Sequence, residues 1–150
     1  DGELKGWGRN SRLDNIQAAI LRHNLRTYDQ IVEKRRMVAN RYHEQLSSLE
    51  ELTLPRPPKQ NSAYYDVFQN YELQVENRDQ LKEFLHQNGI GTLLQWGGKA
   101  VHQWEVLGFT QRLPKTELFF EKCLMLPMNT FLDDDDIDYV CETIRKFYRD

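Results

Sequence analysis

The sequence predicts an α+β fold in which helices cover one face of a small, mainly antiparallel sheet. Three observations support this class. Apolar residues in the N-terminal third are spaced three and four positions apart, as in amphipathic helices. After a group of prolines the spacing changes to the two-residue alternation that is typical of strands. Later strands are interleaved with shorter helices, and the chain closes on a continuous helical stripe, an order that favours an α+β layer.

Two consecutive helices are expected near the N-terminal end. Ser11 is followed three positions later by Asp14, a capping-box-like pair, so the first helix should begin near residue 12. The first apolar face carries Leu13, Ile16, Ile20 and Leu25, and the second carries Tyr28, Val32, Ala39, Tyr42, Leu46 and Leu49. The second pattern is short for a coiled coil, so packing onto its own domain is favoured. Three prolines then end the helical region, namely Pro55, Pro57 and Pro58.

The central part is expected to build a sheet. Alternating apolar residues predict strand structure over residues 63–67 and 71–75, with a break near Gln69. Asn77 is placed to cap a helix that carries three apolar residues on one side. Gly89 is placed to end that helix in a left-handed conformation.

The C-terminal part is predicted to alternate between strands and helices. Residues 90–96 are expected to form a strand that Gly97 and Gly98 interrupt, and a short helical piece is expected over 100–107. Pro114 should open a helix through about Lys122, and a strand should follow over 123–126. The closing helix has the clearest stripe, which consists of Ile137, Val140, Cys141, Ile144, Phe147 and Tyr148.

Composition and charge limit the classes of partner. The 150 residues are 39% hydrophobic, enough for one sizeable core. Twenty basic residues against twenty-three acidic residues give a net charge of −3, so we expect no nucleic-acid partner and no membrane surface. No apolar run approaches membrane-spanning length. Cys123 and Cys141 lack metal or redox spacing, which predicts buried free thiols and a cytoplasmic location.

No metal site is expected either. The acidic run from Asp133 to Asp136 lacks the alternating ligands and central glycine of a calcium loop. Its place just before the closing helix favours an interaction with the helix dipole instead. His23, His43 and His86 lie on helices without a ligand-like spacing, so they are interpreted as structural.

Residues 8–19 form the most specific motif of the chain and read GRNSRLDNIQAA. This segment resembles the G-x-N-x-R-L-D-x-x-Q-A-A signature of the DegT-type sugar aminotransferases. The resemblance continues in family order through further residues: Arg35, Arg36, Tyr42, Tyr71, Gly89, Ile90, Thr92, His102, Leu113, Pro114, Thr116, Glu117, Leu124, Leu126, Pro127 and Met128. It covers nearly the whole chain but only the C-terminal portion of such an enzyme, because the family's Schiff-base lysine lies upstream of the motif. The chain is therefore expected to be a fragment that is inactive alone.

The resemblance implies the small C-terminal domain of a fold-type I enzyme that uses pyridoxal 5'-phosphate (PLP). Residues 1–26 would form an interdomain loop and helix that carries the motif, and a long helix would bridge to the remainder of the enzyme. Residues 27–150 would form the small α+β domain. The family's enzymes move an amino group, typically from glutamate, to a keto sugar carried on a nucleotide, in polysaccharide or deoxyamino-sugar synthesis.

The resemblance also implies site residues. Asn10 would bind the cofactor phosphate of a neighbouring subunit in a homodimer, and Arg12 would meet the acidic substrate. An amide at a loop-to-helix junction and a guanidinium fork both suit phosphate oxygens. Gln95, Trp96 and His102 would select the substrate, although many relatives carry a His-Tyr or similar pair where Gln95 and Trp96 stand. We expect no catalytic residue within the chain itself.

Two alternatives remain open from the sequence. A PLP-dependent dehydratase-like enzyme, or a non-catalytic relative, would share this half of the chain almost unchanged. The chain could also be a stand-alone interaction module that dimerises through its long helix.

Overall fold

The computed structural model describes residues 13–59 and 63–149. The helical N-terminal part consists of α1 (Asn15–Asn24), the 3-10 turn η1 (Leu25–Thr27) and α2 (Tyr28–Leu46). The strands are β1 (Leu52–Thr53), β2 (Tyr71–Val75) and β3 (Cys123–Leu126). The other helices are α3 (Arg78–Gln87), α4 (Pro114–Lys122) and α5 (Asp134–Arg149), and three more 3-10 turns are η2 (Gln95–Gly98), η3 (Val101–Gln103) and η4 (Glu105–Leu107).

The three strands form an antiparallel sheet in the order β1-β2-β3. The central strand β2 pairs with β1, where Val75 faces Leu52, and with β3, where Tyr71 faces Leu126. Its side chains alternate between buried and half-buried because successive residues point to opposite faces. The face with Tyr71 and Val75 is the core face.

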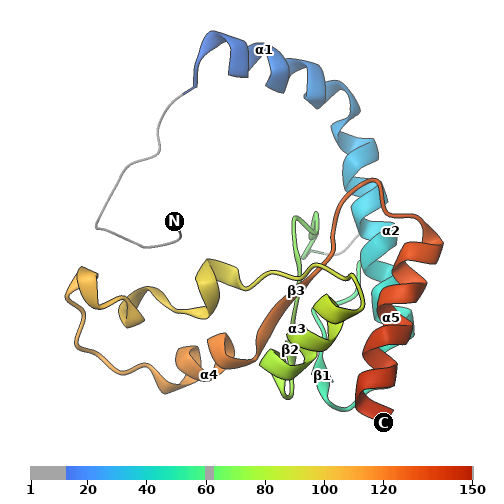
Figure 1. Ribbon diagram of the computed structural model, residues 1–150. Coiled ribbons are helices and arrows are strands. Elements are labelled where there is room, and N and C mark those ends of the chain that lie inside the picture. Colours follow the sequence, from blue (N-terminus) through green and yellow to red (C-terminus); the bar gives the residue numbers. More distant parts are fainter. Residues whose placement is uncertain (1–12, 60–62, 150) are drawn as a thin grey trace.

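Three helices cover the core face, as the sequence predicts. Helix α5 packs against both α2 and α3 (Figure 1). Its buried residues repeat at three- and four-residue intervals, and the apolar stripe predicted from the sequence forms the centre of the core. Apart from Phe68 in the loop before β2, the largest fully buried side chains come from these helices and from the two longer strands: Tyr42, Leu46, Leu81, Leu85, Ile137, Ile144, Tyr71, Leu73 and Leu124.

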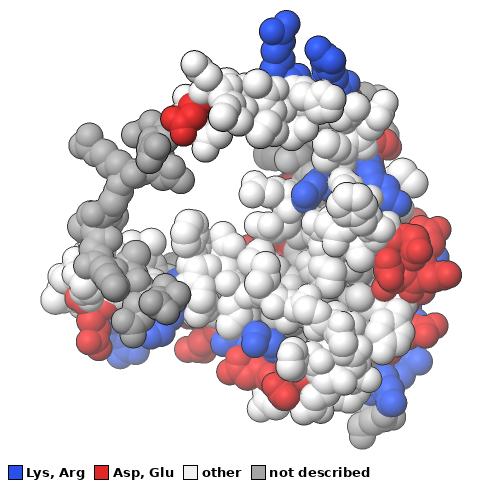
Figure 2. Space-filling model, turned by 45° about the horizontal axis from the view of Figure 1, so that its top comes forward, with Lys and Arg blue, Asp and Glu red and all other residues white. Residues whose placement is uncertain are grey.

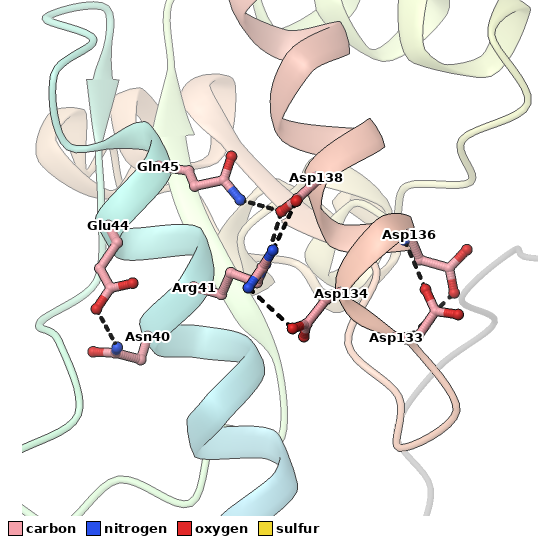
Figure 3. Close-up of polar contacts among 8 residues, drawn as sticks. All are labelled: Asn40, Arg41, Glu44, Gln45, Asp133, Asp134, Asp136 and Asp138. Atoms are coloured by element: carbon pink, nitrogen blue, oxygen red, sulfur yellow. Dashed lines mark hydrogen bonds and ion pairs between the residues drawn. The ribbon is translucent and has the colours of Figure 1, made fainter.

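A polar clamp joins α2 to α5 at the edge of this core (Figure 3). Arg41 donates through Nε and Nη2 to the two carboxylate oxygens of Asp138, each at 2.7 Å, and through Nη1 to Asp134 at 3.1 Å. Gln45 also donates to Asp138. The Arg41 bond is the main cause that lowers the pKa of Asp138, since a bidentate guanidinium favours the ionised carboxylate.

The acidic run from Asp133 to Asp136 forms the start of α5, with three of the four aspartates in its first turn. Asp133 accepts the backbone N–H of Asp136 at 2.9 Å, and Asp136 accepts the backbone N–H of Asp133 at 3.2 Å (Figure 3). This reciprocal cap and the Asp134 ion pair explain three of the four aspartates structurally. The predicted role in the helix N-terminus is confirmed.

Residues 63–67 do not form the predicted strand. Two adjacent arginines of α2 donate hydrogen bonds to backbone carbonyl groups in and beside this segment instead. Arg35 donates to the carbonyls of Phe68 and Gln69, at 3.1 and 2.6 Å. Arg36 donates to the carbonyls of Asp66 and Lys59, at 2.6 and 2.9 Å. The segment is thus held by side-chain donors where a strand would be held by a neighbouring strand.

Residues 90–96 also differ from the prediction. Within this stretch one residue, Leu93, pairs with Met125 on the free edge of β3, through two backbone hydrogen bonds of 2.9 and 3.2 Å. The chain then leaves the sheet and enters η2, so the predicted strand is wrong apart from this single bridge. The break at Gly97 and Gly98 is confirmed, since both have positive φ.

Several other predicted boundaries are confirmed. Asn77 occupies the N-cap position of α3, although it has φ 56° and its side chain makes no capping hydrogen bond. Gly89 follows this helix with φ 77°, and the amide of the next residue bonds back to Leu85 at 2.9 Å. Pro114 opens α4, and the short helical piece over 100–107 is present as η3 and η4. The first helix starts slightly later than expected, with Asp14 as N-cap and Gln17 bonding back to it; Ser11 lies outside the described residues.

Helix α1 extends away from the core (Figure 1) and has no buried residue. Three of its apolar side chains, Ile16, Ile20 and Leu21, are exposed. So are Leu13 just before the helix, Leu25 in η1 and Tyr28 at the start of α2. Cys123 and Cys141 are buried free cysteines, as predicted. Among the described residues, no helix combines the length and apolar character that crossing a lipid bilayer requires.

Candidate functional site

Three of the five predicted site residues lie in the described part of the chain. Gln95 and Trp96 lie in η2, and His102 lies in η3. Asn10 and Arg12 lie outside the described residues. The described candidates gather around one helix, because η2 contacts α4 directly and His102 bonds to a side chain of α4.

The η2 turn holds an aromatic side chain in an unusual backbone conformation. Trp96 has φ 50° and ψ 34°, and Gly97 and Gly98 continue with φ 70° and 78°. Three consecutive left-handed residues are rare, and a bulky side chain with positive φ stores strain of the kind found at binding and catalytic sites. The Trp96 side chain is 71% exposed. An exposed indole on a fixed turn offers a stacking face and an N–H donor to a ligand.

Both its positive φ and the close approach of neighbouring side chains favour glycine at position 98. A Cβ atom at this position would lie 3.2 Å from Cδ1 of Leu94 and 3.4 Å from Nη1 of Arg78. Arg78 in turn donates to the carbonyl of Phe120 at 3.1 Å. The turn is therefore pressed closely against α3 and α4, which fixes the position of Trp96.

His102 is nearly buried and paired with a carboxylate. Its Nε2 atom lies 3.1 Å from Oε1 of Glu117, and its side chain is 9% exposed. The same carboxylate accepts the backbone N–H of Leu113 at 2.8 Å, and Arg112 approaches its other oxygen at 4.0 Å. The Leu113 bond, followed by the His102 bond, lowers the pKa of Glu117.

This pair ties the 3-10 turns at 101–107 to the start of α4. Glu117 satisfies an amide just before the helix and a ring nitrogen fifteen residues earlier in the chain. It is a site-neighbouring residue whose pairing with His102 the sequence reasoning missed. The available signal was the position of both residues among the motif positions shared with the family.

Beside η2, Lys99 places its ammonium over the ring of Trp104, with Nζ 5.4 Å from the ring centroid. Further apolar side chains are exposed along the same segment: Leu93, Val101, Val106, Phe109 and Leu113. Figure 2 shows an open hollow between α1 and this segment, and the described side chains facing the viewer around it are mostly neither basic nor acidic. Such a surface suits burial against another part of a protein.

Comparison with known proteins gives a consistent result. Residues 2–145 match the DegT/DnrJ/EryC1/StrS aminotransferase family. The chain is similar to a pleiotropic regulatory protein of Geobacillus stearothermophilus, with 36% identity over 148 residues that cover 95% of the chain and 39% of that protein. It is also similar to the UDP-N-acetyl-3-dehydro-alpha-D-glucosamine 3-aminotransferase of Acidithiobacillus ferrooxidans, with 33% identity over 93% of the chain and 37% of the relative.

Solved structures agree with this result. An aminotransferase of the family from Brucella abortus has 31% identity and a TM-score of 0.79, over 95% of this chain and 38% of its own. Streptomyces venezuelae DesV, solved in complex with a ketimine intermediate, has 28% identity and a TM-score of 0.83 over the same shares. The chain thus spans less than two fifths of the length of these relatives. Because the match extends over nearly all of the sequence and over the fold, the chain belongs to the DegT/DnrJ/EryC1/StrS aminotransferase family.

Proposed function

We propose that the complete protein containing this chain is an aminotransferase that transfers an amino group, from glutamate, to a keto sugar carried on a nucleotide. The observation that carries the proposal is the family match over residues 2–145, joined to relatives whose names describe transamination of UDP- and dTDP-linked sugars. The product would enter polysaccharide or deoxyamino-sugar synthesis in the cytoplasm.

PLP is the cofactor expected of this family. When bound, it supplies the electron sink that transamination needs. Asn10 is proposed to hold its phosphate across a homodimer interface, and Arg12 to meet the acidic substrate; both lie outside the described residues. For Trp96 and Gln95 we propose substrate contact, supported by the exposed indole on its strained turn. His102 is proposed to select the substrate with its ring held by Glu117.

The proposed domain organisation follows the exposure of α1. Residues 1–26 would form the interdomain loop and helix, and residues 27–150 the small domain. An α-helix with apolar side chains along its length and no buried residue needs a partner surface, which the remainder of the enzyme or a second subunit would supply. The 150 residues alone are expected to be inactive, because none of their lysines stands in the family's Schiff-base context.

The test uses the intact protein with PLP, glutamate and a panel of UDP- and dTDP-linked keto sugars. We expect a new amino-sugar nucleotide by mass spectrometry and equimolar 2-oxoglutarate. Asn10→Ala should weaken cofactor retention on dialysis, whereas Asn70→Ala, an exposed amide on a loop of the small domain, should not. Absence of amino transfer to every sugar nucleotide of the panel would contradict the proposal.

A second candidate is a non-catalytic regulatory protein. It is favoured by the name of the Geobacillus stearothermophilus relative, a pleiotropic regulatory protein. A dehydratase-like activity is separated by the same assay, because its sugar product would carry no new amino group. A regulatory protein would leave both glutamate and the sugar nucleotide unchanged.

A further inference from the structure

Arg78, the first residue of α3, borders the turn that carries Trp96. A Cβ atom at Gly98 would lie 3.4 Å from its Nη1 atom, so the guanidinium lies directly beside this turn. The Arg78 side chain is 13% exposed, which places most of it inside the protein. Neither the family resemblance nor the proposed function assigns a role to this residue.

The guanidinium of Arg78 is itself held at two points. Nη1 donates to the carbonyl of Phe120 at 3.1 Å, and Nε lies 2.6 Å from Oδ1 of Asp79. The Asp79 side chain is 76% exposed, so the Phe120 bond is the better shielded of the two contacts. Phe120 belongs to the last turn of α4, where carbonyl groups have no partner within the helix. Arg78 therefore joins the beginning of α3 to the end of α4.

The conformation of the Trp96 turn needs support from its surroundings. Trp96, Gly97 and Gly98 all have positive φ, and glycine loses more conformational freedom on folding than any other residue. The amide of Gly97 bonds to the carbonyl of Leu94 at 3.2 Å, at the long end of the normal range. Strained turns of this kind persist where the neighbouring structure fixes them. The neighbours of Gly98 are the Leu94 side chain and the guanidinium of Arg78.

Helix α4 is tied to two candidate site residues, one near each of its ends. In its first turn, Glu117 pairs with His102. In its last turn, the Phe120 carbonyl holds Arg78 beside the turn of Trp96. Helix α4 is thus the common support of both candidate contacts, and loss of the guanidinium would release Trp96 while His102 stays in place.

We propose that Arg78 is a positioning residue of the candidate site, which holds the Trp96 turn against the end of α4 and so presents the indole to the substrate in one orientation. The proposal rests on the proposed function for the identity of the substrate, whereas the placement of the indole does not depend on it. A contact that is oriented in advance strengthens binding because less ordering is needed when the ligand arrives. Loss of Arg78 should therefore weaken substrate binding without changing the reacting groups.

The kinetic test compares Arg78→Met with Arg78→Lys in the intact protein. Arg78→Met should raise KM for the sugar nucleotide about fivefold at nearly constant kcat, as expected when one aromatic binding contact is lost. Arg78→Lys should fall between this variant and the parent, because an ammonium can still donate to the Phe120 carbonyl but lacks the planar fork. The matched control, Arg145→Met, removes a half-buried arginine that bonds to Gln45 in the α2–α5 contact, and it should leave KM unchanged.

A double-mutant cycle shows whether Arg78 acts through the indole. Trp96→Ala alone should raise KM, and adding Arg78→Met should change this KM by less than about twofold, because no indole is left to misplace. Effects of the two substitutions that multiply would show an independent structural role and overturn the proposal, and so would an unchanged KM in either single variant. If Arg78→Met lowers the yield of folded protein, Arg78→Gln takes its place in the cycle with the same expectations.

Fluorine NMR of the intact protein labelled with 5-fluorotryptophan separates this proposal from the proposed function. The Trp96 signal is the one absent from Trp96→Phe, and the Trp104 signal, identified in the same way, serves as the internal reference. In Arg78→Met the Trp96 signal should move toward that of free 5-fluorotryptophan while the Trp104 signal stays in place, and in Arg145→Met neither should move. A Trp96 signal at its parent position in Arg78→Met would overturn the proposal even in an active enzyme. A displaced signal in a protein without amino transfer would refute the proposed function and retain the positioning role of Arg78.

Discussion

Replacing the two neighbouring glycines of η2 by alanine should separate backbone strain from close packing. Gly97 and Gly98 both have positive φ, so alanine at either position costs about 1 kcal/mol in local stability. At Gly97 a Cβ atom meets nothing within 4 Å. At Gly98 it would press on Leu94 and on Nη1 of Arg78, which is held by the Phe120 carbonyl. We expect about 1 kcal/mol more at Gly98, since a tightly packed contact must give way.

Amide hydrogen exchange of the intact protein, read on peptides from residues 93–104, measures this local free energy. With fast reclosing, Gly97→Ala should speed exchange about fivefold, and Gly98→Ala about thirtyfold, because 1.4 kcal/mol corresponds to a factor of ten. Peptides from α5 serve as an internal control and should not change. Equal acceleration in the two variants would refute the packing argument, and no acceleration in either would refute the left-handed turn.

Three further predictions concern the core and its charged contacts. Tyr42→Phe removes the hydroxyl that donates to the Pro127 carbonyl at 3.0 Å inside the core, so it should lower the free energy of unfolding, measured in urea, by about 1–2 kcal/mol. Burial also raises the pKa of Tyr42 well above its usual value. The parent protein should therefore lose stability above about pH 10, and the variant should lose it less steeply. Asp138→Asn should weaken the loss of the free energy of unfolding at acid pH. The folded-state pKa of this carboxylate is lowered, so its stabilising contribution is present above the unfolded-state pKa and is lost as pH falls through the folded-state pKa. A loss at acid pH as steep as that of the parent would refute a stabilising Arg41 clamp. Glu117→Gln should speed hydrogen exchange of the Leu113 amide. It should also remove an acid-dependent loosening of residues 101–113, because the pKa of Glu117 is lowered in the folded protein and its stabilising contribution is lost at low pH. Unchanged exchange at this amide would show that the carboxylate does not hold the segment.

The elements that could be predicted from the sequence are those whose signals are local. The α5 stripe, the Asn77 and Gly89 ends of α3, and the Pro114 start of α4 each depend on residues within a few positions of one another. Their side-chain spacing or backbone preference acts in any tertiary setting. The fold class follows from them, because such amphipathic elements bury their apolar faces in few ways.

The candidate site was predictable only in part. The motif positions indicated Gln95, Trp96 and His102, and the structure gathers these three around α4. Their spacing gave no sign that Trp96 would adopt φ 50° or that His102 would lie nearly buried beside Glu117. The pairing of His102 depends on Glu117 of α4, which lies fifteen positions later in the chain.

The two predicted strands that failed show the same limit. Residues 63–67 alternate as a strand does, but the carbonyl of Asp66 accepts from Arg36, thirty residues earlier in the chain, and the carbonyls of Phe68 and Gln69 just beyond accept from Arg35. Residues 90–96 alternate too, but only Leu93 pairs with the edge of β3 before the left-handed residues 96–98 turn the chain away from the sheet. The hydrogen-bond partner of a backbone group is the donor or acceptor that lies close to it in the folded protein, which need not be near it in the sequence.

The amino-acid sequence by itself determined the family of this protein, its helices and the apolar faces that form its core, because periodicity and motif residues are written in local order. Only the tertiary structure decided where the polar groups find their partners: the Arg41 clamp, the His102–Glu117 pair and the buried Arg36 guanidinium over the ring of Tyr65. Hydrogen bonds and charges act over a few ångströms, and the residues that they join here are separated by 15 to about 100 positions in the chain.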